Sequence, residues 1–258
     1  HIPSRLFLPS LVISYFATGP PGIITGLLLI DLGLAFECPV GVMGQINTLS
    51  SIVAVIFALF MGALSVRFKH KSLLVVGLLF LNISALACPL SSNFNFMLIS
   101  YSLTGVAWAM IMPMASSLIG EHLPLEKRAN AVGWIAAGGS LAYVIGAPVI
   151  SIIAGFGGWR LAFFGFAVPI SFVGLLLALV GLPSTSQSHE STMSKGTYLG
   201  NFKKVLSERS AVACLVGDTL RMTAFVVILI YGISFFRQRF LVSTDFASLI
   251  LIGGALCY

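Results

Sequence analysis

Long apolar segments recur along almost the whole chain, and short polar stretches separate them. Each approaches the ~20 residues that a helix needs to cross the hydrocarbon core of a bilayer. The segments are apolar on every side, whereas a membrane-spanning strand alternates polar and apolar positions. The pattern therefore predicts an all-α, polytopic membrane protein. We expect an eighth span to begin near Phe246, after seven complete ones at residues 6–29, 40–64, 73–88, 94–118, 131–154, 161–182 and 211–236.

A polar segment divides the first six spans from the rest. Residues 183–196 read PSTSQSHESTMSKG, a composition typical of a flexible linker. Just after it, Tyr198, Phe202 and Leu206 recur at helical spacing beside two lysines, which predicts a short amphipathic helix on the membrane surface. We predict a six-helix N-terminal bundle at 1–182, a cytoplasmic linker at 183–209 and the start of a second bundle at 210–258.

The six-helix bundle is predicted to contain an internal repeat. A shift of 93 residues brings identical residues together in spans one to three and four to six. The identities are Pro20 with Pro113, Gly62 with Gly155, and Arg67 with Arg160. Because each unit has an odd number of spans, the two units are expected to be inverted in the membrane.

Composition and charge support a membrane protein. Of 258 residues, 58% are hydrophobic and 9% are charged, against roughly 25% charged in soluble domains. The net charge of +6 does not indicate nucleic-acid binding, because the basic residues lie in short loops. One predicted side carries ten of the 14 Lys and Arg, and the other carries Arg160, Arg237 and Arg239. Cytoplasmic loops are rich in Lys and Arg, so we expect a plasma-membrane protein with a cytoplasmic amino terminus.

Few residues suggest covalent or metal chemistry. The four cysteines include no CxxC pair, which argues against a zinc or redox site. The spacing of Cys38 and Cys88 leaves a disulfide and two free thiols as alternatives, and we expect free thiols. The four histidines lie in loops or at the terminus, and no HExxH, GxSxG or P-loop string occurs. We predict no enzyme activity, no metal site and no cofactor.

The loop after the second span carries a family signature. Residues 62–72 read GALSVRFKHKS, which resembles the G-x-L-x-D-R-x-G-R-K signature of the major facilitator superfamily. Gly62, Leu64, Arg67 and Lys71 match it, whereas Val66 replaces its Asp. Further similar strings follow in the same order over essentially the whole chain: Gly105 with Pro113, Pro124 with Arg128 and Gly133, the Gly-Ala-Pro of 146–148, and the GWRLAF of 158–163.

The resemblance implies an architecture and a way of working. Members of this family have twelve helices in two six-helix halves around a central cavity, and they work by alternating access. The chain would then be a fragment holding the first half, the linker and the start of the second half. In the family the signature loop latches the cytoplasmic side, so Gly62, Arg67 and Lys71 are the candidate gating loop. A plain positively charged loop remains the alternative.

Proline and aromatic residues within the spans are candidates to line a cavity. Pro20 and Pro21 remove two hydrogen bonds from the first span, a break tolerated only where protein or water satisfies the carbonyls. We therefore expect Thr18, Pro20 and Pro21 to face the cavity, with a buried kink as the alternative. Tyr101 and Trp108 share one face of the fourth span and could hold an apolar or aromatic solute, although packing would also explain them.

Four further residues are assigned to helix packing. Gly105 and Pro113 lie in the fourth span, and Gly146 and Pro148 lie in the fifth. Small residues let helices approach closely, and proline bends them.

Asp218 and Arg221 lie well inside the seventh span. Arg221 is predicted to be about 15 Å deep at 1.5 Å per residue, close to the middle of the bilayer core. The i, i+3 spacing puts both side chains on one helix face, where their charges can neutralise each other. We predict a pair that binds solute or a proton, with a structural ion pair between helices as the alternative.

We therefore expect a secondary active transporter of small organic solutes, and specifically an exporter. The expected partners are a small-molecule substrate, a coupling proton or ion, and the lipid bilayer, with no nucleic acid and a monomeric state. Two alternatives remain open at this point. One is an uptake permease of the same family, and the other is a transporter-like sensor or scaffold without flux.

Overall fold

The computed structural model describes residues 5–183 and 207–240, and within these ranges every regular element is a helix. The elements are α1 (Phe7–Phe16), α2 (Gly19–Leu27), α3 (Leu29–Ala35), α4 (Val40–Met43), α5 (Gln45–Arg67), α6 (His70–Ala87), the 3-10 helix η1 (Cys88–Leu90), α7 (Phe94–His122), α8 (Leu125–Ala162), the π-helix η2 (Phe163–Ala167), α9 (Val168–Gly181), α11 (Arg209–Val227), the π-helix η3 (Ile228–Gly232) and α12 (Ile233–Phe240). The predicted all-α fold is confirmed.

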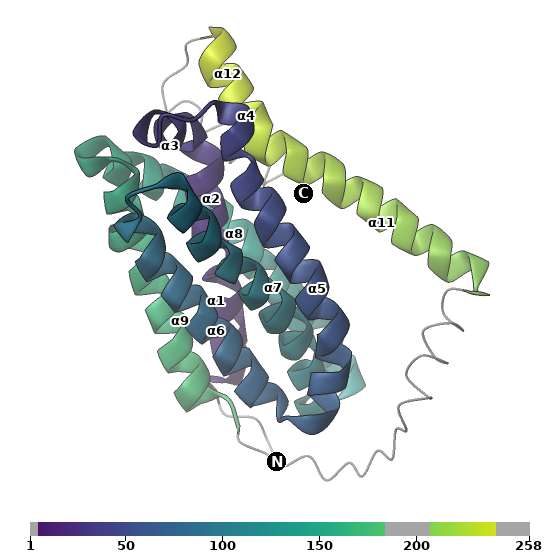
Figure 1. Cartoon of the computed structure of the whole chain (residues 1–258). Helices are drawn as coiled ribbons and strands as arrows, with labels where there is room; N and C mark the ends of the chain where they lie inside the picture. The colour runs from purple at the N-terminus through teal and green to yellow at the C-terminus, as the bar shows by residue number, and fades with distance from the viewer. Residues whose placement is uncertain (1–4, 184–206, 241–258) are drawn as a thin grey trace.

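Helices α1 to α9 pack into one bundle, and α11 with α12 forms a rod beside it (Figure 1). The most extensive helix contacts join α7 to α6 and to α5. One cluster of buried side chains, around Leu11 and Ile111, joins α1, α6, α7 and α9. A second cluster, around Ile24 and Met43, contains residues of α2, α3, α4, α5 and η2. The buried apolar side chains of the bundle therefore form two clusters.

Five segments of the described chain are long and apolar enough to cross a membrane: Phe7–Leu27, Val40–Arg67, His70–Leu90, Phe94–His122 and Leu125–Gly181. The last has 57 residues and covers the predicted fifth and sixth spans. It departs from helical geometry at Gly157 and Gly158, where Gly158 has a φ of 71°. Glycine adopts this backbone conformation without steric cost. The chain therefore turns between the fifth and sixth spans near the expected GWR string.

The first span is divided into three helices, a detail that hydropathy alone did not predict. The first break follows Phe16, and Pro20 and Pro21 then occupy the first turn of α2, where a missing N–H breaks no helical bond. A second break lies at Leu28, whose φ of −106° and ψ of 23° leave the helical region. The chain thus bends at the proline pair and again at its far end.

The seventh span is helical but differs in composition from the others. The predicted range 211–236 lies within the rod of α11, η3 and α12. This rod is not among the five apolar segments, and Asp218 and Arg221 both lie within it. The predicted eighth span and the amphipathic helix fall outside the described residues. The division at the linker stays a prediction.

Basic residues cap helices at both ends of the bundle. Lys71 donates from Nζ to the carbonyls of Leu179 and Leu182 at 2.9 and 2.6 Å, which satisfies the carboxyl end of α9. At the opposite end, Arg160 donates to the carbonyls of Pro89 and Ser91 at 3.2 and 3.0 Å. Such contacts complement the negative end of a helix and hold the loops in place. Which end faces the cytoplasm stays a prediction.

Candidate functional site

The Gly-Pro-Pro-Gly segment is buried against α8. Thr18 is 3% exposed, and both prolines are buried. A Cβ on Gly19 would lie 2.7 Å from the Ala142 side chain, so the two helices touch almost backbone to backbone. Small residues permit this close approach. In this structure the expected cavity-lining residues Thr18, Pro20 and Pro21 therefore lie in a helix contact.

Of the four residues assigned to packing, Gly105 and Gly146 lie close to a neighbouring helix, whereas Pro113 is exposed. A Cβ on Gly105 would overlap the backbone carbonyl of Ser50, so Gly105 is where α7 crosses α5. A Cβ on Gly146 would lie 3.1 Å from the Ile23 side chain. Pro148 lies one turn or less from Gly146 within α8 and is half-buried.

Tyr101 belongs to a buried chain of polar side chains from three helices. Its hydroxyl lies 3.1 Å from Thr25 Oγ1 of α2 and donates to Asn47 Oδ1 of α5 at 3.3 Å. The Asn47 amide nitrogen is buried and has no hydrogen-bond partner within the described part of the chain. A buried amide without a partner costs about 1–3 kcal/mol. This nitrogen could therefore bind a hydrogen-bond acceptor from a ligand or from water.

Thr25 and Asn47 were not among the residues predicted from the sequence. Asn47 is an amide in a strongly apolar span, and that could have drawn attention to it. Thr25 offered no such signal, because a threonine in a helix usually bonds its own backbone. Indeed, its hydroxyl also lies 3.1 Å from the carbonyl oxygen of Pro21.

Trp108 lies in a different environment from Tyr101, although both were placed on one helix face. Tyr101 is 3% exposed and Trp108 is 40% exposed. The Trp108 ring packs edge-on against Tyr15, with ring centroids 6.1 Å apart. α5 and α7 are most closely packed at Gly105 and leave room farther along. A cavity of about 290 Å³ opens between them there, lined by Ala58, Met61, Gly62, Ser65, Ala109, Pro113, Met114 and Ser117.

The candidate gating loop is partly engaged in structural contacts. Lys71 caps α9, as described above, and Gly62 lines the cavity between α5 and α7. Arg67 is exposed at the carboxyl end of α5. His70, where the family signature has Arg, lies 2.7 Å from the Glu121 carboxylate. The loop thus connects the start of α6 to the ends of α7 and α9.

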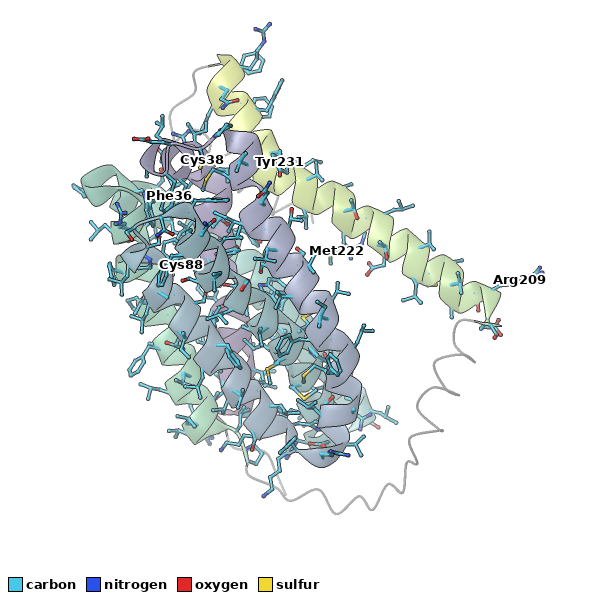
Figure 2. The ribbon with its side chains drawn as sticks, viewed as in Figure 1. Phe36, Cys38, Cys88, Arg209, Met222 and Tyr231 are labelled. Carbon is cyan, nitrogen blue, oxygen red and sulfur yellow. The ribbon has the colours of Figure 1, made fainter. Side chains whose placement is uncertain are left out.

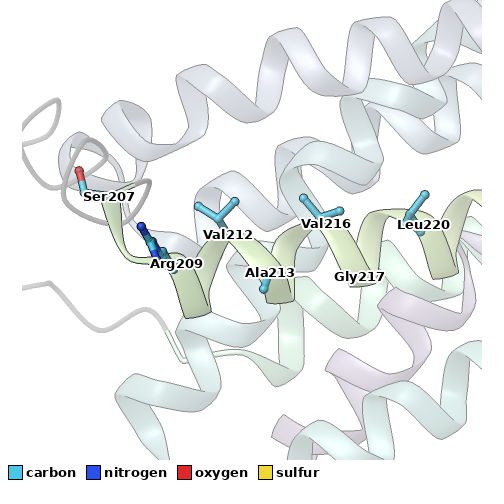
Figure 3. Close-up of a pocket in the computed structure, with 7 residues that line it drawn as sticks. All are labelled: Ser207, Arg209, Val212, Ala213, Val216, Gly217 and Leu220. Atoms are coloured by element: carbon cyan, nitrogen blue, oxygen red, sulfur yellow. The ribbon is translucent and has the colours of Figure 1, made fainter.

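Asp218 and Arg221 form the expected contact with each other. Arg221 donates from Nη2 and Nε to Asp218 Oδ1 at 2.8 and 3.1 Å. The side chains are 63% exposed for Asp218 and 51% exposed for Arg221. An open groove of about 630 Å³ follows α11, and neither residue lines it (Figure 3). The groove is lined by Ser207, Arg209, Val212, Ala213, Val216, Gly217 and Leu220.

The sequence analysis also missed an ion pair that links the rod to the bundle. Arg237 of α12 lies 2.7 Å from Asp31 of α3. The two residues are 206 positions apart in the sequence, so no local spacing could have revealed the pairing. Cys38 and Cys88 are free thiols, as expected, and Cys214 is free as well. The fourth cysteine lies outside the described residues.

Comparisons with known proteins agree on one family. The model of the Major Facilitator Superfamily matches residues 8–257. The chain is 30% identical over 166 residues to the uncharacterized MFS-type transporter YwfA of Bacillus subtilis strain 168, covering 64% of this chain and 40% of that protein. It is 25% identical over 235 residues to Multidrug resistance protein 1 of the same strain, covering 86% and 57%. The chain thus spans about half the length of these relatives.

Solved structures share the fold. A D-xylose-proton symporter superposes with a TM-score of 0.70 at 16% identity, over 97% of this chain and 65% of that one. A bacterial homolog to the human lysosomal transporter Spinster, in an inward-facing and unoccupied conformation, superposes with a TM-score of 0.67 at 18% identity, over 97% and 58%. At these identities the likeness establishes the fold alone.

Proposed function

Because the chain belongs to the major facilitator superfamily, whose model matches residues 8–257, we propose that it acts in secondary active transport of small organic solutes by alternating access. The supporting observation is the arrangement of the helices. A six-span bundle lies beside a rod from beyond the linker, and side chains on the rod contact the bundle at one end. Alternating access requires two such bodies to rock about a shared site.

Export is the proposed direction. Support comes from Multidrug resistance proteins 1 and 2 of Bacillus subtilis, which are similar to this chain at 25% and 29% identity. The half-exposed aromatic pair of Tyr15 and Trp108 would suit an apolar or aromatic solute. Uptake by a permease remains the second candidate, since the D-xylose-proton symporter shares the fold. A sensor without flux would bind solute in the same cavity but would not complete the alternating-access cycle.

The proposed solute path runs along α1, α2, α5, α7 and α11. We assign to it Thr18, Pro20, Pro21, Tyr101, Trp108, Asp218 and Arg221, together with Asn47, whose amide nitrogen has no hydrogen-bond partner among the described residues. The proposed cytoplasmic gate comprises Gly62, Arg67 and Lys71. Burial of Thr18 and the prolines against α8 requires that this contact loosens during the cycle, because solute reaches them only when α2 and α8 separate. A coupling proton or ion, a monomeric state and plasma-membrane location complete the proposal.

Flux measurements on the whole protein in proteoliposomes test the function. With an imposed pH gradient, we expect lipophilic aromatic dyes to accumulate in vesicles whose cytoplasmic face points outward, and a protonophore should abolish the accumulation. Accumulation in vesicles of the opposite orientation would favour the permease. Saturable dye binding without any flux would favour the sensor.

Cysteine replacement at Thr18 and Ile23 tests the site. Both positions lie beside the proline break and are almost fully buried in this structure. If the break lines the path, a water-soluble thiol reagent should modify at least one of them during turnover, and substrate should slow the reaction. If both stay inert in every condition, the break is buried packing.

A further inference from the structure

We propose that Asp31 and Arg237 form an ion-pair latch that holds the bundle and the rod together at the end predicted to be extracellular. The proposal rests on the proposed alternating-access function and names a device for one half of that cycle. With the latch closed, a path between the two bodies is sealed at this end and open at the other. Release of the latch would open the extracellular side.

The latch joins three backbone elements through one guanidinium group. Arg237 Nη1 donates to Asp31 Oδ2 at 2.7 Å and to the Leu27 carbonyl at 2.9 Å, and Nη2 lies 3.5 Å from Asp31 Oδ1. Leu27 is the last residue of α2, and Asp31 lies in the first turn of α3. The break at Leu28 thus places a helix carboxyl end and a carboxylate side by side. Both attract a cation, so the break creates the receptor for Arg237.

A second contact closes the same end of the molecule. A Cβ on Gly44, just before α5, would overlap the Tyr231 hydroxyl, so the Tyr231 side chain lies directly on that backbone. Ser234, between Tyr231 and Arg237, is 4% exposed, and its hydroxyl has no hydrogen-bond partner in the described part of the chain. The Ser234 hydroxyl would form hydrogen bonds with water when the two bodies separate. This gain favours a reversible contact over a permanent one.

The main contacts between the described part of the rod and the bundle lie at this end. η3 and α12 pack on α2, whereas farther along the rod Leu215, Val216 and Leu220 are 53%, 54% and 66% exposed. In Figure 1 α11 diverges from α5 toward its start, and Figure 2 shows Tyr231 beside the bundle and Arg209 far from it. The rod thus contacts the bundle at one end and diverges from it toward the other.

The strength of the pair suits a latch. Arg237 is 13% exposed and Asp31 is 39% exposed, so the pair is screened by water on one side only. Partly exposed ion pairs stabilise a contact modestly, and both groups regain hydration when it opens. Loss of either charge should therefore shift the population of states without unfolding the bundle.

The test measures access to a reporter cysteine at Ser51 from the extracellular side. Ser51 lies seven residues after Gly44 in α5, on the same helix face and about two turns deeper, and it is exposed in this structure. The native cysteines are replaced in the whole protein, and a membrane-impermeant maleimide is applied to intact cells. In the latched state labelling should be slow.

Neutral variants should open the extracellular side. We expect Asp31→Asn and Arg237→Gln each to raise the labelling rate about three- to tenfold. The charge-exchanged double variant, Asp31→Arg with Arg237→Asp, should return the rate toward that of the parent. Glu37→Gln and Arg239→Gln are matched controls, because both residues are exposed and lie close to the pair in sequence. Neither should change the rate.

The outcome is readable even where a variant folds poorly. Raising the ionic strength should speed labelling of the parent and leave the Arg237→Gln variant unchanged, because salt screens only a pair that is present. Equal labelling of parent, single variants and controls would overturn the latch. Labelling needs no solute flux, so a gated protein that carries nothing would overturn the proposed function while leaving the latch intact.

Discussion

At the residue scale, glycine positions decide which helices can touch. Gly105 and Gly120 both lie in α7, yet their surroundings differ completely. A Cβ on Gly105 would overlap the carbonyl of Ser50, whereas a Cβ on Gly120 would meet nothing within 4 Å. The same chemical change therefore has opposite consequences at two places on one helix.

We expect Gly105→Ala to lower stability by about 1–3 kcal/mol, because α5 and α7 must separate to admit the methyl group. Thermal unfolding in detergent, followed by size-exclusion chromatography, measures the effect. Gly120→Ala is the matched control and should leave the midpoint unchanged or raise it, since alanine favours helix. A Gly105→Ala variant as stable as the control would show that the crossing is looser than described.

The sequence pointed to Gly105 and Tyr101 but not to Thr25 and Asn47, the polar partners of Tyr101. Small residues in an apolar span favour close helix crossings, although Gly120 of the same helix does not lie at one. A three-residue polar chain depends instead on which helices meet, and hydropathy carries no such information. For the same reason Tyr101 and Trp108 looked equivalent on a helical wheel, although α5 covers only the first.

Tyr101→Phe tests whether this polar chain contributes more than packing. Removing the hydroxyl leaves Thr25 Oγ1 and Asn47 Oδ1 without that partner, and we expect a loss of about 1–2 kcal/mol in stability. In a double-mutant cycle with Thr25→Val, the two losses should not add. Thr48→Val, at an exposed position of α5, serves as the control. Additive losses would mean that the two hydroxyls act independently.

At the element scale, apolar length predicted the spans, and local backbone chemistry decided their details. Pro20 and Pro21 predicted the first break, and Gly157 and Gly158 lie at the turn between spans five and six. The break at Leu28 carries no proline or glycine. It arises where α2 gives way to α3, and only tertiary packing determines it. Hydropathy therefore predicted the extent of the first span but not its division into three helices.

Lys71 shows how one residue can serve both an element and a gate. Its ammonium group donates to two carbonyls at the end of α9, so we expect Lys71→Met to cost about 1–3 kcal/mol. Amide hydrogen exchange at residues 179–182 should accelerate. Lys69→Met is the control, because Lys69 is exposed in the same loop. Unchanged exchange together with lost transport would instead assign Lys71 to the cytoplasmic gate alone.

At the scale of the whole molecule, the surface of the rod poses an energetic problem. The bundle meets lipid with apolar side chains, as its many exposed Leu, Ile, Val and Phe residues require. α11 presents Asp218 and Arg221 instead, both more than half exposed. A charge at the centre of the hydrocarbon costs about 2.5–3.5 kcal/mol on insertion scales. This face of α11 must therefore meet water or other protein, which is the position that a solute path would give it.

The last prediction asks whether Asp218 and Arg221 work in transport or only hold helices together. In the whole protein, Asp218→Asn and Arg221→Gln should express normally and either lose transport or lose its dependence on pH, because each removes one of the two charges that the proposed site uses to bind a charged group or exchange a proton. The double variant should stay inactive. Arg209→Gln, at the exposed start of the same helix, should transport normally. A structural pair gives the opposite pattern, since each single variant leaves one charge unpaired and misfolds, whereas the double variant removes both charges and recovers full transport.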